Sequence, residues 1–271
     1  MHLRGKWIVI TGGSSGIGAE LGMQIAQVAD RVTLVADGEE RLAAAGNAMR
    51  GLGATIDTVR CDIGSRSDVQ ALVATLLLDG RAPDLLVNNA GFGTYTPFEA
   101  ASGDEIDRLL EVNLVGHVRL THGLVGAMVA RRSGAICFVA SAAGRIPITP
   151  NATYCAAKHG MFGLAEALRY ELRRFGVEVT AVCPGRVDTA FFDDPTFRER
   201  TLGPENRSAL SVGRVAAATL RAIERARPVT FVPASLGFAT WVYEAFGPVT
   251  RPLYSLLMKS RIERIYADAG R

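Results

Sequence analysis

The sequence has few aromatic residues, few cysteines and no large excess of either charge, and each shortage excludes a class of protein. Aromatic residues make up 7% of the 271 residues, and 30 Lys and Arg residues stand against 27 Asp and Glu residues. So small and dispersed a net charge offers no basic patch for nucleic acid, and we expect no nucleic-acid partner. The hydrophobic share of 48% excludes a disordered chain, and the length fits one domain with a large core.

The four cysteines are widely and unevenly spaced, at Cys61, Cys137, Cys155 and Cys183. This spacing predicts neither a zinc site nor a disulfide framework, so we expect no metal ion and a reducing compartment. No signal-peptide pattern follows Met1, and the stretch 228–250, which has no Lys or Arg, is interrupted by Glu244, proline and glycine. We therefore expect a cytoplasmic protein without a transmembrane span, with peripheral association with a membrane as the alternative.

Short β-branched and apolar runs of strand length alternate with longer helical patterns. The runs lie at 7–10, 32–35, 55–59, 85–87, 135–139, 177–182 and 229–232. Apolar residues fill them almost without alternation, so we expect a parallel sheet of about seven strands with helices on both faces. The predicted architecture is a doubly wound α/β fold in a single domain. We assign 1–228 to a dinucleotide-binding catalytic part and 229–271 to the last strand and an apolar C-terminal extension of the same domain.

A glycine-rich turn, TGGSSGIG at 11–18, follows the first predicted strand and precedes a predicted helix at 19–28. Its glycines allow torsions and close approaches denied to other residues, so backbone N–H groups and the helix N-terminus can hold a pyrophosphate. The second strand ends at Asp37, about twenty residues further on, where a carboxylate can accept hydrogen bonds from ribose hydroxyls. A carboxylate there would repel a 2′-phosphate, which favours NAD over NADP.

A second group of polar residues predicts proton chemistry. Tyr154 and Lys158 lie four residues apart on one face of a predicted long helix. A tyrosine that exchanges protons near neutral pH needs a nearby positive charge to stabilise its phenolate, and Lys158 supplies one. Ser141 follows the strand at 135–139, at the carboxyl edge of the sheet, where its hydroxyl can polarise a substrate oxygen. Asn113 lies within a helical pattern, where an amide is unfavourable unless its polarity is needed.

Six ordered motifs resemble those of the short-chain dehydrogenase/reductase family. They are TGxxxGxG at 11–18, NNAG at 88–91, Asn113, Ser141, YxxxK at 154–158 and the stretch 184–189. The resemblance covers roughly residues 4 to 232 and implies a Rossmann-type fold. It implies that Tyr154 is the general acid/base, that Lys158 lowers its pKa and holds the nicotinamide ribose, that Ser141 orients the substrate oxygen, and that Asn113 supports a proton-relay water.

The resemblance also implies which residues hold the cofactor. Asp62 matches the family's adenine-contacting aspartate, Asn89 its cofactor-pocket asparagine and Thr189 the residue at the carboxamide. NADP-binding members often carry Lys or Arg at the places of Ser14 and Ser15, so the serines again favour NAD. The predicted cofactor-binding residues are Gly12, Ser14, Ser15, Gly16, Ile17, Gly18, Asp37, Asp62, Ile63, Asn89, Ala90, Gly91, Tyr154, Lys158, Pro184, Gly185, Val187 and Thr189.

These residues predict an oxidoreductase that transfers a hydride between a nicotinamide cofactor and a small-molecule secondary alcohol or ketone. NAD preference points to alcohol oxidation, although one site catalyses both directions. Two other functions stay open. One is an NAD-binding regulatory or scaffold protein, which the intact Tyr154 and Lys158 disfavour. The other is a membrane-surface-associated reductase of lipid-like carbonyls.

Three variable regions, 92–98, 142–151 and the segments after Pro184, are apolar overall and favour a lipophilic substrate. Arg145 is expected to bind an anionic group of that substrate. The candidate pocket residues of these regions are Phe92, Tyr95, Ile146, Ile148, Phe191, Phe192 and Phe197. An equally weighted alternative is that the loop aromatics seal the cofactor site or pack at a subunit contact. The family often assembles through helices that begin here near Asp104 and Thr153, so we expect a homodimer or homotetramer, with the choice between them open.

The C-terminal extension from Val229 is rich in apolar residues that must be covered. A lid or a subunit interface is favoured over a membrane-surface helix, whose basic residues would be Arg251, Lys259, Arg261 and Arg264. Prolines and glycines divide the extension as far as Pro252, so only 253–266 is expected to form an unbroken helix of about four turns.

Overall fold

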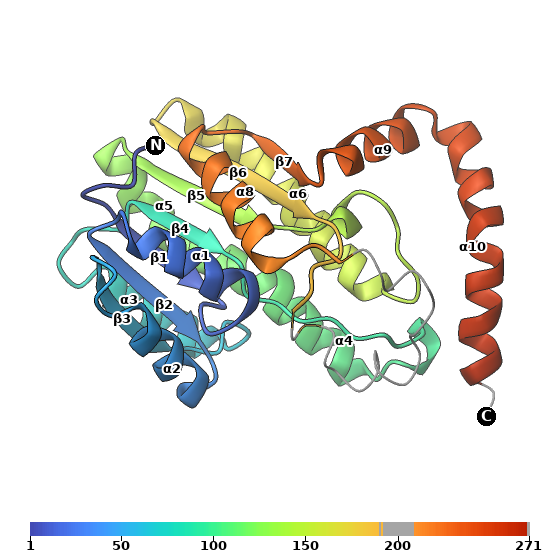
Figure 1. The fold of residues 1–271 in the computed structure, drawn as a ribbon, viewed down its shortest axis with the longest axis horizontal. Coiled ribbons are helices and arrows are strands. Elements are labelled where there is room, and N and C mark those ends of the chain that lie inside the picture. Colours follow the sequence, from blue (N-terminus) through green and yellow to red (C-terminus); the bar gives the residue numbers. More distant parts are fainter. Residues whose placement is uncertain (190, 192–208, 270–271) are drawn as a thin grey trace.

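The chain folds around a seven-stranded parallel sheet (Figure 1). The structure is a computed structural model, and it describes residues 1–189, 191 and 209–269. The strands are β1 (Trp7–Thr11), β2 (Arg31–Ala36), β3 (Thr55–Arg60), β4 (Leu85–Asn88), β5 (Gly134–Val139), β6 (Val177–Pro184) and β7 (Val229–Val232). All pairs are parallel, in the order β3-β2-β1-β4-β5-β6-β7. This confirms the predicted Rossmann-type doubly wound fold and all seven predicted strands.

Helices cover both faces of the sheet because the side chains of each strand alternate between two cores. The helices are α1 (Gly16–Ala26), α2 (Glu39–Met49), α3 (Arg66–Leu76), α4 (Gly103–Leu110), α5 (Gly116–Arg131), α6 (Ala152–Arg173), α8 (Val212–Glu224), α9 (Ala234–Ala245) and α10 (Gly247–Ala269). Ile8 and Ile10 of β1 join the core made with α1, α2 and α8. Val9, between them, joins the opposite core made with α3, α5 and α6. Strands that are covered on both faces are therefore largely apolar.

The edge strand β3 departs from the prediction that the strands are buried on both faces. β4 is buried at every position, whereas no residue of β3 is fully buried. β3 lies at the end of the sheet and pairs only with β2. Its sequence, TIDTVR, is correspondingly polar at four of its six positions.

The strand order places a crevice at one edge of the sheet. From β1 the chain passes to β2 and β3 on one side, and then returns to β4, β5 and β6 on the other. The connections after β1 and β4 therefore diverge at their carboxyl ends, and this is where open α/β sheets bind ligands.

The C-terminal extension differs from its predicted form. α10 begins at Gly247 and runs through Pro252, so the expectation that a helix starts only at 253 is wrong. Pro248 lies in the first turn, where backbone N–H groups have no helical acceptor, and Pro252 removes only one bond near the start. The Thr250 hydroxyl also donates to the carbonyl oxygens of Tyr243 (2.8 Å) and Phe246 (3.1 Å), which joins the two helices.

Figure 1 shows α9 leading away from the β7 edge and α10 at the periphery of the molecule. Among the described residues, no helix combines the length and apolar character needed to cross a membrane.

Candidate active site

A cavity of about 590 Å³ lies at the carboxyl edge of the sheet and gathers the predicted residues. Every predicted cofactor-binding residue except Gly18 lines it, and so do Ser141, Tyr154 and Lys158 of the predicted catalytic group. Gly18 and Asn113 lie behind the lining. Residues between Thr11 and Val112 in the N-terminal half, together with others from β5, α6 and β6, thus face one space, as the strand order requires.

The glycine turn is shaped to lie against the loop after β4. Gly12 and Gly16 have φ of +64° and +54°, a region that side chains other than glycine rarely adopt. A Cβ on Gly12 would lie 2.9 Å from the Cα of Ala90, and one on Gly18 would overlap the carbonyl oxygen of Gly12. Gly18 therefore acts in packing the turn rather than in lining the cavity. The resulting cradle of backbone N–H groups at the start of α1 fits a pyrophosphate.

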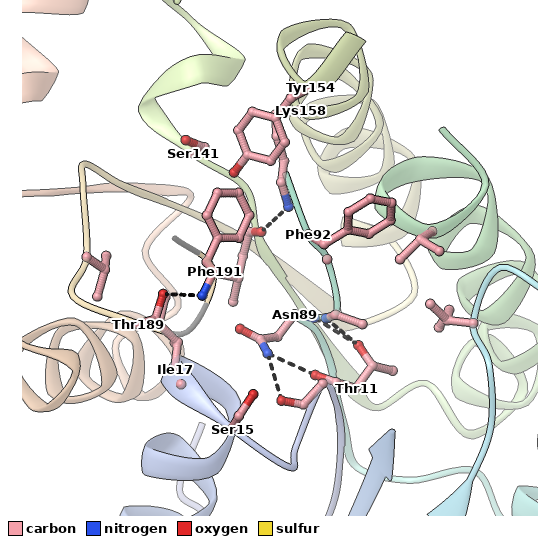
Figure 2. Close-up of a pocket in the computed structure, with 18 of the residues that line it drawn as sticks. Thr11, Ser15, Ile17, Asn89, Phe92, Ser141, Tyr154, Lys158, Thr189 and Phe191 are labelled. Atoms are coloured by element: carbon pink, nitrogen blue, oxygen red, sulfur yellow. Dashed lines mark hydrogen bonds between the residues drawn. The ribbon is translucent and has the colours of Figure 1, made fainter. Parts of the chain in front are cut away.

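Hydrogen bonds fix this contact between the first and fourth strands (Figure 2). The Asn89 side-chain amide donates to the carbonyl oxygens of Thr11 (3.0 Å) and Gly12 (3.3 Å). The Thr11 hydroxyl oxygen accepts from the backbone N–H groups of Asn89 (2.9 Å) and Ala90 (3.1 Å), and the hydroxyl donates to Val87 (3.2 Å). The turn and the NNAG loop are therefore one rigid unit.

Asn113 interrupts the helix between α4 and α5. Its side-chain amide donates to the carbonyl oxygens of Phe92 (2.9 Å) and Leu109 (3.0 Å). Leu109 is the ordinary α-helical acceptor for residue 113, and the chain forms a π-helical turn, η2 (Glu111–Val115), at this point. The other amide atom, Oδ1, is buried and has no hydrogen-bond partner in the described part of the chain.

This Asn113 oxygen lies close to the ammonium group of Lys158. A Cβ on Gly91 would come within 2.5 Å of Asn113 Oδ1 and 3.5 Å of Lys158 Nζ. A buried acceptor without a partner is costly, so Asn113 Oδ1 points to a ligand or a water at this place.

Lys158 and Tyr154 have opposite pKa shifts, with burial as the main cause of both. The Lys158 side chain is 4% exposed, its Nζ donates to the carbonyl oxygen of Val139 at 3.2 Å, and burial lowers its pKa to about 8. Burial raises the pKa of Tyr154 to about 12, against a hydrogen bond with Ser141 that lowers it. Near neutral pH the tyrosine therefore carries its proton and the lysine its charge. The ammonium nitrogen is 5.7 Å from the centre of the tyrosine ring.

The mouth of the cavity is apolar beside Tyr154. Phe191 packs edge-to-face on Tyr154 with ring centres 5.5 Å apart, and its backbone N–H donates to the Thr189 hydroxyl oxygen at 3.3 Å. In Figure 2 the ring of Phe191 lies next to Tyr154 and Ser141. The structure also places Phe92, Tyr95 and Ile148 in the lining, as predicted.

Other predicted pocket residues are not in the lining. Ile146 and Arg145 are absent from it, and Arg145 instead pairs with Glu244 while lying 4.4 Å from the ring centre of Phe162. The expectation that Arg145 anchors an anionic substrate is therefore wrong. Phe192 and Phe197 lie outside the described residues.

Sequence reasoning missed two arginines at the far end of the cavity. Arg41 lines it beside Asp37, and Arg108 lines it with its Nη1 donating to Asp62 Oδ2 at 2.8 Å. Arg60 donates from Nε to the carbonyl oxygen of Asp37 at 3.2 Å. The spacing of four residues between Asp37 and Arg41 was the available signal for the first of these. The end of the cavity near Asp37 therefore carries both acidic and basic side chains.

His117 was also missed. It is fully buried in α5, with Nε2 2.8 Å from the carbonyl oxygen of Ala90 and Nδ1 3.1 Å from Asn88 Oδ1. Burial, together with the charge of Lys158, lowers its pKa to about 3, so the imidazole is neutral. Through these contacts it holds Asn88 and Ala90 of the NNAG loop.

Comparisons with known proteins agree with this geometry. The profile of a family described as short chain dehydrogenase matches residues 6–198. A Streptomyces coelicolor protein provisionally named a ketoacyl reductase is 37% identical over 187 residues, which are 67% of this chain and 70% of that protein.

Two solved structures resemble the whole fold. A short-chain dehydrogenase from Sphingobium yanoikuyae in complex with NADPH is 26% identical, with a TM-score of 0.79 over 92% of this chain and 95% of its own. A short-chain dehydrogenase/reductase from Burkholderia phymatum in complex with NAD is 25% identical, with a TM-score of 0.80 over 90% and 95%.

Proposed function

Because the chain belongs to the short-chain dehydrogenase/reductase family, we propose that it transfers a hydride between a nicotinamide cofactor and a lipophilic secondary alcohol or ketone. The observation that carries the proposal is the meeting of Ser141, Tyr154 and Lys158 in one cavity with the glycine cradle and Asp37. The protonated tyrosine, and a relative named as a ketoacyl reductase, favour the reduction of a ketone as the working direction.

Proton transfer in this proposal belongs to the side chains. Tyr154 holds a proton near neutral pH and donates it to the substrate oxygen, while the Ser141 hydroxyl orients that oxygen. Lys158, charged below its pKa of about 8, stabilises the phenolate that remains. Asn113 Oδ1 is the free acceptor for a water that returns the proton. When bound, nicotinamide supplies or accepts the hydride.

The residues of the cavity divide between the two ligands. We assign the glycine turn, Asp37 and the Asp62–Ile63 pair to pyrophosphate, ribose and adenine. The NNAG loop, Lys158 and the stretch 184–189 are assigned to the nicotinamide half. Phe92, Tyr95, Ile148 and Phe191 are left for the substrate, which supports a lipophilic one because this wall offers mainly apolar and aromatic surface.

We propose that NAD is preferred over NADP. Asp37 lines the cavity, and in this proposal its carboxylate binds the ribose hydroxyls and repels a 2′-phosphate, while no basic residue stands at Ser14 or Ser15. Arg41 acts against this preference, because a guanidinium can pair with that phosphate. Relatives of this fold are found with either cofactor.

The proposed function is tested with the purified chain, both reduced cofactors and a panel of ketones that spans small, aromatic, acyl-thioester and steroid-sized compounds. We expect NADH oxidation that depends on a lipophilic ketone, and its reversal with the matching secondary alcohol and NAD. Tyr154→Phe, with NADH binding retained, is the control. Binding of NADH without turnover of any carbonyl or alcohol would favour the regulatory or scaffold function instead.

We also propose that the chain assembles as a homodimer or homotetramer and that 229–271 belongs to the same domain as 1–228. Pairing of β7 with β6 supports the assignment of 229–271 to the same domain. Assembly is supported by exposed aromatic residues, because exposed apolar surface is commonly covered by another subunit. These residues are Phe238 and Trp241 of α9 and Tyr170 of α6. Light scattering after size-exclusion chromatography would give the mass, and a monomer at micromolar concentration would contradict the assembly.

A further inference from the structure

The C-terminal extension contacts the loop that leads from Ser141 to Tyr154. Arg145 Nε donates to Glu244 Oε1 at 2.6 Å, and its Nη2 donates to the other carboxylate oxygen. Ten residues further along, the Tyr254 hydroxyl donates to the carbonyl oxygen of Pro147 at 2.7 Å. The last two helices, α9 and α10, thus contact two residues of one loop, Arg145 and Pro147 respectively.

Further contacts hold Tyr254 on one side and the loop on the other. Tyr254 packs edge-to-face on Tyr243 of α9, with ring centres 5.5 Å apart. On the opposite side, the backbone N–H of Ile148 donates to the Cys155 thiol at 3.3 Å. The loop is therefore held between α6 and the C-terminal extension.

The same loop forms part of the cavity wall. Ile148 and Asn151 line the cavity together with Ser141 and Tyr154. Within the described part of the chain, no residue after Phe191 lines it. The extension therefore affects the cavity through residues that it contacts: Glu244 and Tyr254 contact this loop, whereas Val232 accepts a hydrogen bond from the backbone N–H of the lining residue Gly185 at 2.8 Å.

We propose that Glu244 and Tyr254 are positioning residues that set the substrate wall formed by Ile148, and thereby determine substrate affinity without touching the substrate. This rests on the proposed function for its kinetic consequence. The bidentate pair of Arg145 and Glu244 is partly shielded, with side chains 29% and 40% exposed. A pair of this kind has a modest effect on stability, so its removal should loosen the loop without unfolding the domain.

The test compares Glu244→Gln and Tyr254→Phe with wild type. We expect KM for the ketone to rise about three- to tenfold in each, since each loses one contact worth about one hydrogen bond. We expect kcat and the dissociation constant of NADH to stay within about twofold, because Tyr154, Lys158 and the glycine cradle are untouched. Glu244→Asp keeps the carboxylate and should keep KM within about twofold. Glu263→Gln, which removes an exposed carboxylate of α10 that pairs with Lys259 at 3.9 Å, is the matched control.

Hydrogen exchange gives a readout that does not depend on turnover. The backbone N–H groups of residues 146, 148, 149 and 151 should exchange faster in Glu244→Gln and Tyr254→Phe than in wild type or Glu263→Gln. Unchanged exchange there, or an unchanged KM in both variants, overturns the proposal, and so does an equal loss of NADH affinity. If wild type turns over no carbonyl or alcohol, the proposed function fails, and the exchange result alone decides the positioning role.

Discussion

Replacement of Lys158 by methionine should stabilise the cofactor-free protein while it abolishes activity. Lys158 is 4% exposed, and burial lowers the pKa of its ammonium group from 10.5 to about 8. At pH 7 this difference between the folded and unfolded chain corresponds to about 3 kcal/mol of lost free energy of unfolding. Methionine removes the buried charge, which is a gain in stability. It also removes the hydrogen bond to the carbonyl oxygen of Val139, which is a loss of about 1 kcal/mol. We therefore expect a net gain of about 2 kcal/mol.

The stability difference between Lys158→Met and wild type should depend on pH. Between pH 8 and 10.5 the unfolded chain binds a proton at Lys158 that the folded chain has lost, so the stability of wild type rises with pH in this window. Since methionine does not titrate, its advantage should shrink to about 1 kcal/mol at pH 9 and disappear near pH 10.

Urea unfolding followed by circular dichroism at pH 7, 9 and 10 measures both effects. Lys259→Met, at a lysine whose side chain is 69% exposed, is the matched control and should change the free energy of unfolding by less than about 0.5 kcal/mol. A Lys158→Met protein that is less stable than wild type at pH 7, or whose advantage does not change with pH, would refute the reasoning.

Three further predictions concern the cavity. Tyr154→Phe should remove turnover by at least a thousandfold and leave NADH affinity within a few-fold, measured by stopped-flow kinetics and fluorescence titration; retained turnover would exclude its role as the acid. Asp37→Ser should improve NADPH affinity about ten- to hundredfold, because it removes a carboxylate from the place of the 2′-phosphate and leaves Arg41 there; a wild-type preference for NADPH would contradict the assignment. Gly18→Ala should weaken NADH binding at least tenfold, because its Cβ overlaps the Gly12 carbonyl oxygen, whereas Gly163→Ala, which meets nothing within 4 Å, should bind normally.

The sheet could be predicted from the sequence because burial on both faces leaves a local signal. In β1 and β4 nearly every residue faces one of the two cores, so the apolar run itself marks the strand. The glycine turn, Ser141 and the Tyr154–Lys158 pair were also within reach, since each depends on the end of a strand or the spacing within one helix.

Contacts between distant segments could not be predicted in this way. Arg145 and Glu244 are 99 residues apart, and nothing in the periodicity of either segment relates them, so Arg145 was given to the substrate. Arg108 reaches Asp62 over 46 residues for the same reason. The start of α10 was missed because the rule that proline ends a helix is local, whereas Pro248 lies in a first turn that tolerates it.

The central claim is that this cavity transfers a hydride to a carbonyl carbon. Its most direct test uses NADH that carries deuterium at both C4 positions of the nicotinamide, with the best ketone from the panel and mass spectrometry of the alcohol product. We predict one deuterium per product molecule, on the carbinol carbon, with NADH consumed in equal amount. Consumption of NADH without deuterium in the product, or a product labelled equally in Tyr154→Phe and wild type at the same rate, would contradict the account.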